Sequence, residues 1–467
     1  MVPPFPLARM GLPTLVWAVV LVIVMGPEVA QAIPTFARRY ETSCQTCHVA
    51  YPKLTPFGEA FRRNGYRFPG GGDALAEKQP PVSLGAEAQR DRFPAVVLPG
   101  ELPGAVPLSL AFDAQLALGR AFEGHGVALG ATPAALGTPT DTPADTPTGP
   151  TENTHEHLSS ALTAGHDDAL ALELGGLARL RLLSGGTLGE RAAFFASVAF
   201  GGHAPVELER ASVVLTPLEP ASLQIEVGAI EPELHGISLH RNLLGHQLRL
   251  TTLRVADNAF APEPSVLALQ VSGVVFGRLG LTAAAVRNPA PVTGLEPDAS
   301  ARVEYKLGGM RLDGEAAAAE SAPWRERSVL LGLSGYRGRA DIGGVREDTF
   351  WRAGADAHVT FDDLSVSVVA ARQQHEHPAT GDAEGRTLDL LYSEVTYVVL
   401  PWLLPTARFE WARLEAPDDP APSQIGLVAL TALVRPNLLL RVEGAVGSAE
   451  GEHFDFRFAT LNLGAAL

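Results

Sequence analysis

From about residue 105 to the C-terminus, apolar and polar residues alternate with a period of two. The alternation is clearest in five runs, at residues 170–182, 223–229, 407–411, 437–443 and 454–458. In an extended chain this pattern places apolar side chains on one face and polar side chains on the other. The runs reach about ten residues, which exceeds the usual five or six of soluble strands and is typical of membrane-spanning ones. A soluble β-sandwich would also alternate, so the pattern predicts strands but leaves the architecture open.

The lengths of the predicted connections distinguish these architectures. Long connections occupy residues 120–167, 231–247, 337–349, 374–386 and 415–422. Short connections occupy residues 218–220, 362–363, 401–405 and 435–437. Alternation of long outer loops with short periplasmic turns is characteristic of outer-membrane barrels. We therefore predict a mainly β protein, an outer-membrane antiparallel β-barrel of about 16–18 strands over residues 105–467, preceded by a small N-terminal α-helical module.

Four aromatic residues lie near predicted strand ends, as expected of an outer-membrane barrel. The four residues concerned are Tyr392, Tyr397, Trp402 and Trp411. Outer-membrane barrels carry aromatic girdles where the wall meets the two membrane interfaces. Ordinary strand composition explains the four residues equally well, because strands are enriched in aromatic side chains.

The N-terminus has the three parts of a secretory signal peptide. Arg9 supplies a positive charge, residues 15–25 form an apolar run, and Ala30-Gln31-Ala32 is an A-x-A cleavage site. The apolar run is shorter than the roughly 20 residues that span a bilayer. We predict a signal peptide over residues 1–32 and export of the mature chain. Further on, residues 74–104 form a Gly-, Pro- and charge-rich linker, and the predicted loop 120–167 is largely of low complexity.

Cys44, Cys47 and His48 form the C-x-x-C-H pattern that attaches a c-type haem. Two thiols three positions apart on one helical turn reach the vinyl groups of one porphyrin edge, and the next residue places its imidazole under the iron. The chain has only two cysteines, so neither is left for a disulfide. The alternatives are a chance match and a thioredoxin-like dithiol, of which the latter would require a βαβ setting that the surrounding sequence lacks. We predict one covalent haem c, with His48 as axial iron ligand, on a module of residues 33–73.

A short helix is predicted directly after the motif. Thr55 is a suitable N-cap, Pro56 suits the first helical position, and Gly65 follows the expected end. One face of this region is apolar and is formed by Leu54, Phe57 and Phe61. We expect this face to cover the porphyrin, with plain core packing as the alternative. Domains below about 40 residues usually need a cross-link, a metal or a partner surface to fold. We therefore expect the module to pack against the rest of the chain.

The net charge of −16 argues against nucleic acid and against anionic lipid as partners. It favours cations or basic protein partners. The sequence shows no nucleophile–base grouping and no phosphate-binding loop, so we assign no catalytic residues.

The segment from Phe36 to Tyr66 resembles the N-terminus of the fused monohaem cytochrome–porin family of outer-membrane proteins. Its most specific features are Phe36-Ala37-Arg38 before the haem motif and the run from Leu54 to Tyr66 after it. The close match covers residues 33–69, and the barrel resembles the family in pattern and length. Members of this family serve as iron oxidases in iron-oxidising bacteria. The resemblance implies a haem module inside the barrel lumen, with electrons passing from an extracellular donor to a periplasmic cytochrome.

The resemblance assigns haem binding to Cys44, Cys47 and His48. Guanidinium groups match carboxylates in geometry, so four arginines are considered as partners of the haem propionates. These are Arg38, Arg39, Arg62 and Arg63, of which Arg38 is best supported by the resemblance. The alternative is that they meet acidic walls of the lumen or water.

The sequence leaves several possibilities for the sixth iron ligand. After removal of the signal peptide the only methionine is Met310, which lies in the barrel region, so methionine ligation within the module is excluded. Either a barrel histidine supplies the ligand, or the iron is five-coordinate or water-ligated. The histidines considered are His125, His203, His235, His240, His246 and His358.

Two His-Glu-His triplets, at residues 155–157 and 375–377, fall in predicted outer loops. Residues two apart in an extended chain point the same way, so each histidine pair can chelate a metal. The simpler interpretation is a solvated polar loop.

Two functions of different classes follow from the sequence. The first is an outer-membrane electron conduit between an extracellular donor, with Fe(II) as one candidate, and a periplasmic carrier; such an activity would be that of a ferrous-iron:cytochrome oxidoreductase. Electron flow in the opposite direction is a variant of it. The second is a soluble periplasmic monohaem cytochrome with a partner- or ligand-binding β-sandwich.

Overall fold

The computed structural model describes most of the predicted module and barrel. The described residues are 35–69, 78, 82–83, 91–92, 101–102, 107–120, 170–173, 179–188, 191–200, 206–218, 222–244, 249–258, 260–261, 265–287, 297–314, 323–344, 346–380, 384–415, 422–448 and 458–466. The predicted signal peptide, nearly all of the linker 74–104 and the loop that follows Arg120 lie outside these ranges.

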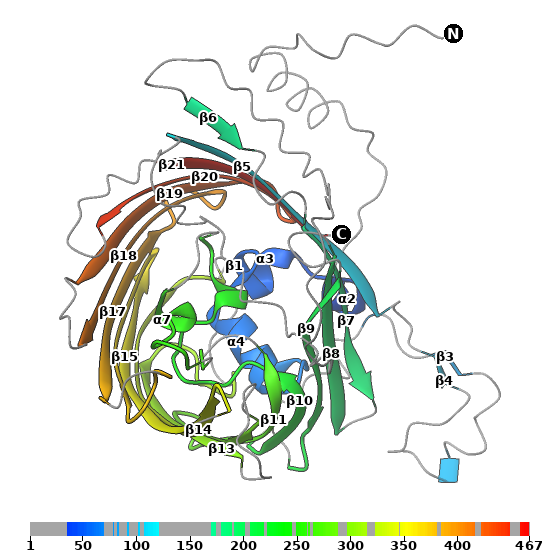
Figure 1. Cartoon of the computed structure of the whole chain (residues 1–467). Helices are drawn as coiled ribbons and strands as arrows, with labels where there is room; N and C mark the ends of the chain where they lie inside the picture. The colour runs from blue at the N-terminus through cyan, green and yellow to red at the C-terminus, as the bar shows by residue number, and fades with distance from the viewer. Residues whose placement is uncertain are drawn as a thin grey trace, which may run out of the picture.

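The described strands of the barrel form one closed antiparallel sheet, in which β21 pairs with β5 (Figure 1). They are β5 Leu108–Arg120, β6 Leu170–Glu173, β7 Arg179–Leu188, β8 Ala192–Phe200, β9 Val206–Leu215, β10 Gln224–Ile230, β11 Val266–Val275, β12 Leu279–Val286, β13 Asp298–Gly308, β14 Glu326–Ile342, β15 Arg346–Asp362, β16 Leu364–His375, β17 Arg386–Tyr397, β18 Leu403–Glu415, β19 Ser423–Arg435, β20 Leu438–Ser448 and β21 Phe458–Ala466. The predicted mainly β barrel is confirmed.

The barrel has sixteen strand positions, although seventeen strands are labelled. The first half of β5 pairs with β7 and its second half pairs with β6. Strands β6 and β7 therefore lie end to end beside β5 and share one strand position. The sequence-based estimate of about 16–18 strands is therefore confirmed.

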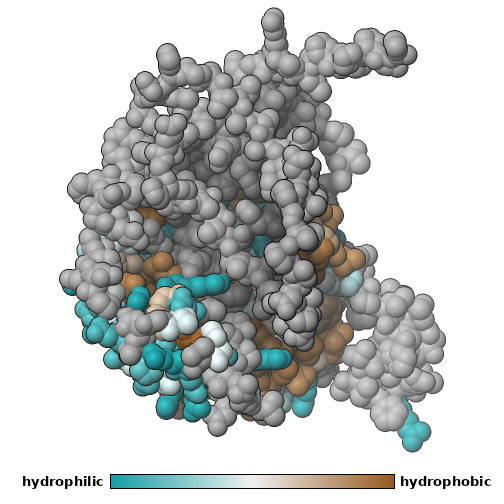
Figure 2. Space-filling view, viewed as in Figure 1, coloured by the Kyte–Doolittle hydropathy of each residue, from teal (hydrophilic) through white to brown (hydrophobic). Residues whose placement is uncertain are grey.

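The two faces of the wall differ as the alternation predicts. In β18, Thr406, Arg408 and Glu410 are buried and point into the lumen, whereas Ala407 and Phe409 are exposed on the outside. Leucine and valine dominate the exposed large side chains of the wall, up to 64% exposure at Val428. Figure 2 shows such apolar side chains along the flank formed by β8 to β10. An apolar surface of this extent is expected of a wall that faces lipid.

We call the end of the barrel where β5 begins the inner mouth, and the opposite end the outer mouth. Most predicted connections have the expected lengths: the inner mouth carries the tight turns at 436–437 and Asp363, and the outer mouth carries 376–385 and 416–422. The predicted long loop at 337–349 is wrong, because β14 and β15 continue to a turn at 343–345. Gly343 and Gly344 both adopt positive φ there, which glycine tolerates in a tight turn. A long inner connection, 309–325, was not predicted.

The aromatic girdle is only partly as predicted. Tyr397 and Trp402 lie at the inner mouth and are 46% and 50% exposed, as expected of a girdle. Tyr392 points into the lumen and is 1% exposed, so its assignment to the girdle is wrong. The structure adds Phe276 and Phe361 to the exposed aromatic residues at the inner mouth.

The N-terminal module lies inside the barrel, as the blue helices of Figure 1 show. It contains α2 Thr35–Tyr40, α3 Cys44–Cys47, β1 His48–Ala50, β2 Lys53–Leu54 and α4 Pro56–Arg63. Its contacts with the wall cluster at the inner mouth. The Thr35 backbone N–H donates to Ser109 at the start of β5, and Gln45 donates to the carbonyl of Pro401 in an inner turn. The module therefore occupies the inner part of the lumen.

A second segment enters the lumen from the outer mouth; it comprises residues 231–244 and 249–258, and we call it the inward segment. It contains η2 Leu239–Arg241 and α7 Arg249–Thr252. Leu243 is fully buried against Leu404 and Leu439 of the wall. Asn258 holds the C-terminal end of the segment, because its side-chain amide donates to Asp348 of β15 over 2.6 Å. No helix within the described ranges is long and apolar enough to cross a bilayer.

Arginine on the outer face of β19 should destabilise the barrel in a depth-dependent way. Val428 lies near the middle of the strand and Val434 near its inner end, and both face outward. We expect Val428→Arg to cost about 2–4 kcal/mol of unfolding free energy, and Val434→Arg about 0–1 kcal/mol. Denaturant titration of protein folded into lipid vesicles measures both values. Equal costs at the two positions would contradict a lipid-facing wall.

Candidate haem-attachment site

The haem motif is folded as its chemistry requires. Cys44 and Cys47 begin and end the single turn of α3, both are free thiols, and both are half-buried. Ser43 caps the turn, because its hydroxyl accepts a hydrogen bond from the backbone N–H of Gln45. His48 follows directly as the first residue of β1. The turn therefore presents two thiols and an imidazole side by side.

The protonation of His48 suits an axial iron ligand. Burial lowers the pKa of His48 to about 4, so its imidazole is neutral at pH 7. Its Nδ1 lies 3.3 Å from the carbonyl oxygen of Pro52, which assigns the proton to Nδ1 and leaves the Nε2 lone pair for a metal. Burial raises the pKa of Cys47 to about 12 and also raises that of Cys44, so both are neutral thiols. The donor set fits a c-type haem.

Helix α4 packs directly against the motif. Thr55 caps the helix at Gly58 N–H over 3.0 Å, while its own hydroxyl donates to the carbonyl of Thr46 over 2.8 Å. A Cβ atom on Gly58 would lie 2.1 Å from the carbonyl oxygen of Cys47, so only glycine allows this approach. The N-cap, the proline at the first position and the helix end predicted from the sequence are confirmed.

The predicted apolar face of α4 contributes to an aromatic cluster. Phe57 and Phe61 pack with other rings of the module and with Phe195 of β8; the remaining members of the module are Phe36, Tyr40, Tyr66 and Phe68. Phe36 stacks on Tyr66 with ring centroids 5.4 Å apart, and Tyr66 stacks on Phe195 at 5.6 Å. These contacts are core packing between module and wall; that the face also covers a porphyrin stays a prediction.

Ion pairs fix the module to its surroundings. Lys53 binds Glu394 of β17 over 3.0 Å, and Arg63 binds Glu304 of β13. Arg62 binds Glu233 of the inward segment over 2.5 Å. The sequence did not identify these carboxylates, because Lys53 and Glu394 lie 341 positions apart. A lumen lined by charges of both signs thus replaces water around the charged module.

The arginines considered for the propionates take up other contacts. Arg62 and Arg63 meet acidic residues of the lumen, which was the alternative. Arg39 donates to Thr187 and lies over the ring of Tyr40. Arg38 donates to the carbonyl of Leu108 and to Thr35. The propionate role of Arg38 stays a prediction.

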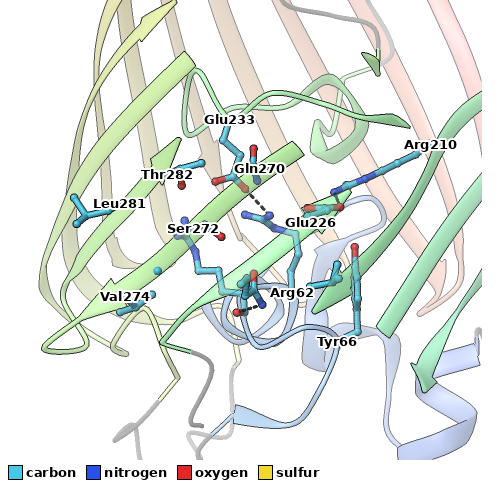
Figure 3. Close-up of a pocket in the computed structure, with 14 residues that line it drawn as sticks. Arg62, Tyr66, Arg210, Glu226, Glu233, Gln270, Ser272, Val274, Leu281 and Thr282 are labelled. Atoms are coloured by element: carbon cyan, nitrogen blue, oxygen red, sulfur yellow. Dashed lines mark hydrogen bonds and ion pairs between the residues drawn. The ribbon is translucent and has the colours of Figure 1, made fainter. Parts of the chain in front are cut away.

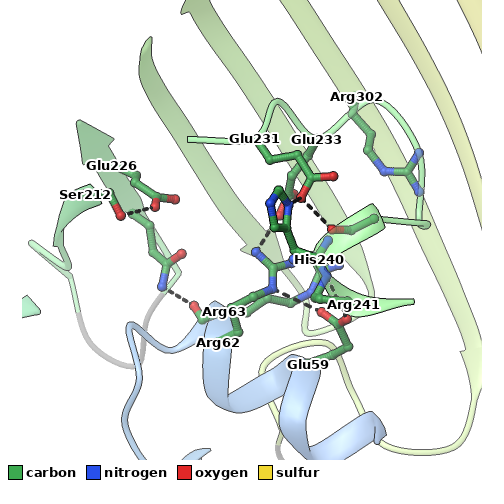
Figure 4. A network of polar contacts seen from close by, with 12 residues as sticks. Glu59, Arg62, Arg63, Ser212, Glu226, Glu231, Glu233, His240, Arg241 and Arg302 are labelled. Atoms are coloured by element: carbon green, nitrogen blue, oxygen red, sulfur yellow. Dashed lines mark hydrogen bonds and ion pairs between the residues drawn. The ribbon is translucent and has the colours of Figure 1, made fainter. Parts of the chain in front are cut away.

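Figure 4 shows how α4 and the inward segment interlock through charged groups. Arg62 lies between Glu59 of its own helix and Glu233, and Arg241 of η2 reaches Glu59 over 3.7 Å. Burial alone would raise the pKa of Glu59, but the guanidinium groups of Arg241, Arg62 and Arg63 outweigh it and lower the pKa to about 2. The two lumen segments therefore depend on one another electrostatically.

Two cavities border α4. The smaller lies between the helix and strands β9 to β12, where Arg62 and Tyr66 face Glu226 and Gln270 (Figure 3). The larger is bounded by Leu54 and α4, by the inward segment and by strands β13 to β17. Both are lined mainly by polar and charged side chains, so the space between the described elements of the lumen is polar.

Three of the histidines considered as sixth ligand lie within the described residues, and each has at least one ring nitrogen in a hydrogen bond. His235 accepts from Arg352 at Nε2 over 3.1 Å, and His240 contacts Glu231 over 3.3 Å. His358 contacts Ser367 and Asp356 through its two ring nitrogens. His125, His203 and His246 lie outside the described residues, so the sixth ligand stays open.

The second His-Glu-His triplet has a structural role. His375 is 1% exposed, its Nδ1 lies 2.6 Å from Asp348, and its ring stacks on Phe350. The backbone N–H groups of Glu376 and His377 donate to the same Asp348. Within the described ranges no group of three or more His, Cys, Asp or Glu residues is arranged to hold a metal ion. The interpretation as a solvated loop is wrong for His375, because this side chain is buried. The triplet at 155–157 lies outside the described residues.

Comparison with solved structures gives the fold class. OmpF of Salmonella typhi, in a complex with daunomycin, matches with a TM-score of 0.50 and 8% identity, over 78% of this chain and 98% of that one. An anion-selective porin of Comamonas acidovorans gives 0.49 and 10%, over 77% and 97%. The channel DcaP of Acinetobacter baumannii gives 0.46 and 12%, over the same shares. No protein-family model and no curated protein sequence matches. The chain has the closed antiparallel barrel of outer-membrane porins.

Acidification should loosen α4 from the inward segment. The pKa of Glu59 is about 2 in the folded protein and 4.5 without these contacts. Because the folded-state pKa is the lower one, its stabilising effect is complete above pH 4.5 and is lost as the pH falls towards 2. Hydrogen exchange of the α4 peptide, corrected for intrinsic rate, should accelerate over that range. Glu59→Gln is the control, and its hydrogen exchange should lack the acceleration that protonation of Glu59 causes. An unchanged pH dependence in the variant would contradict the role of the Glu59 carboxylate.

Proposed function

We propose that the chain is an outer-membrane electron conduit, in which one covalent haem c on Cys44, Cys47 and His48 carries electrons between an extracellular donor and a periplasmic cytochrome. The observation that supports this best is the position of the haem motif. A C-x-x-C-H turn, with a neutral imidazole whose Nδ1 contacts a backbone carbonyl, lies inside the lumen of a barrel whose exterior is apolar.

The arrangement of residues suits such a conduit. The hydrocarbon region of a membrane excludes charged groups, so a centre that exchanges electrons on both sides must sit in a shielded channel. The wall supplies that shield, and the ion pairs at Lys53, Arg62 and Arg63 hold the module in the inner part of the lumen. When bound, the haem supplies a one-electron carrier whose potential depends on its axial ligands and surroundings. His48 would hold the iron, and the Pro52 carbonyl would orient its imidazole through Nδ1.

Fe(II) is the donor that we propose first. The resemblance of residues 33–69 to fused cytochrome–porins supports it, and the net charge of −16 favours the approach of cations. The variant with outward electron flow uses the same residues and differs only in the potentials of the two partners. The soluble cytochrome with a β-sandwich is not supported, because the described strands close into a barrel with a polar lumen and an apolar exterior.

Removal of the motif residues tests the proposal. Purified wild-type protein in detergent should show a c-type haem spectrum and a haem-stained band, and mixing with Fe(II) in a stopped-flow instrument should reduce the haem. Cys44→Ala/Cys47→Ala should lose the covalent stain, and His48→Ala should lose most haem incorporation or show an altered spectrum. His377→Ala, on an outer connection, is the matched control and should keep the spectrum. Wild-type protein without covalent haem would overturn the proposal.

A further inference from the structure

Lys53 lies between the haem motif and the barrel wall. It follows Pro52, whose carbonyl oxygen contacts Nδ1 of His48, and it belongs to β2, which pairs with β1 so that Leu54 lies opposite His48. The Lys53 ammonium donates to Glu394 over 3.0 Å and to Thr396 over 2.9 Å, both on β17. A short covalent path therefore joins the carbonyl that orients His48 to an anchor on the wall.

The wall side of this anchor is itself fixed. Glu394 is 5% exposed, accepts a hydrogen bond from the Tyr392 hydroxyl over 2.9 Å, and lies 3.3 Å from the guanidinium of Arg408. The Lys53 side chain is only 18% exposed. A buried charge pair with several partners has a defined geometry, and loss of one member leaves the other uncompensated. The Lys53–Glu394 pair is thus a rigid connection rather than a solvated surface contact.

We propose that Lys53 and Glu394 are positioning residues for His48: their ion pair fixes the Pro52 carbonyl against Nδ1 and thereby sets the reduction potential of the haem. This inference rests on the proposed function, because it requires the haem. A carbonyl oxygen that accepts a hydrogen bond from Nδ1–H makes the imidazole a stronger donor to the iron, which stabilises the ferric state and lowers the potential.

Potentiometric titration of the holoprotein tests the inference. If the pair acts by positioning, Lys53→Met and Glu394→Gln should both raise the potential, because each weakens the hydrogen bond to His48. If the pair acts through charge alone, Lys53→Met should lower the potential, since it removes a positive charge, while Glu394→Gln should raise it. Shifts of opposite sign would therefore overturn the inference.

Two further variants serve as controls. Lys53→Arg keeps the charge and the donor, and its potential should lie close to that of the wild type. Glu233→Gln removes a carboxylate from another ion pair between module and lumen, that with Arg62, and it should cause a smaller shift than Glu394→Gln. Equal shifts in Glu233→Gln and Glu394→Gln would show that any loosening of the module has this effect, and would contradict a specific role of the pair.

Haem content and folding are measured alongside. Pyridine haemochrome absorbance gives haem per chain, and heat-modifiable gel migration reports barrel closure. If the wild type carries no haem, the proposed function fails. If all variants carry haem and fold but Lys53→Met leaves the potential unchanged, the proposed function stands and the positioning role fails. If Lys53→Met does not fold, Thr396→Val, which removes the second acceptor of Lys53, should give a smaller shift of the same sign.

Discussion

The structure depends on the burial of charge within a wall that faces lipid. Period-two alternation turns apolar side chains outward and leaves the inner face to residues such as Arg408, Glu410 and Glu443. A lumen of this kind cannot collapse into a dry core, because buried charges need partners. In this chain the partners come partly from neighbouring strands and partly from the N-terminal module. The barrel provides enclosure, and the module neutralises lumen carboxylates that would otherwise require water.

This constraint explains why two segments share the lumen. The module enters at the inner mouth and places Lys53, Arg62 and Arg63 against acidic residues. The inward segment enters from the outer mouth and brings Glu233 and Arg241 to α4. Apolar contacts add to these ion pairs. Phe61 and Tyr66 pack against the wall at β8, and Leu243 packs against the wall at β20. Domains below about 40 residues usually need a partner surface, and these contacts give the small module its enclosure.

Much of this fold could be predicted because its signals are local. The alternation in β18, the N-cap at Thr55 and the C-x-x-C-H spacing each arise within a few residues. The errors arise where a local pattern has two meanings. Tyr392 suits a girdle as well as a lumen, and only the phase of β17 decides between them. The polar run at 337–349 resembled a loop, although two long strands and a glycine turn fit the same residues.

The partners of the module could not be predicted from one sequence. Glu394 and Glu304 are ordinary inward residues of the wall until the barrel closes and the module docks. Their pairing depends on which strands lie beside the module, which is a property of the closed barrel. The same holds for the ion pair of Arg62 with Glu233, because nothing in the sequence of residues 231–244 indicates that this stretch turns into the lumen.

Transfer of electrons across the wall by a haem inside the lumen can be measured in sealed lipid vesicles. Protein is inserted into vesicles that enclose an oxidised soluble cytochrome c, and Fe(II) is added outside. Wild-type protein should reduce the enclosed cytochrome, whereas Cys44→Ala/Cys47→Ala should give no reduction above the protein-free rate. Equal rates for the two proteins would contradict a haem-mediated conduit.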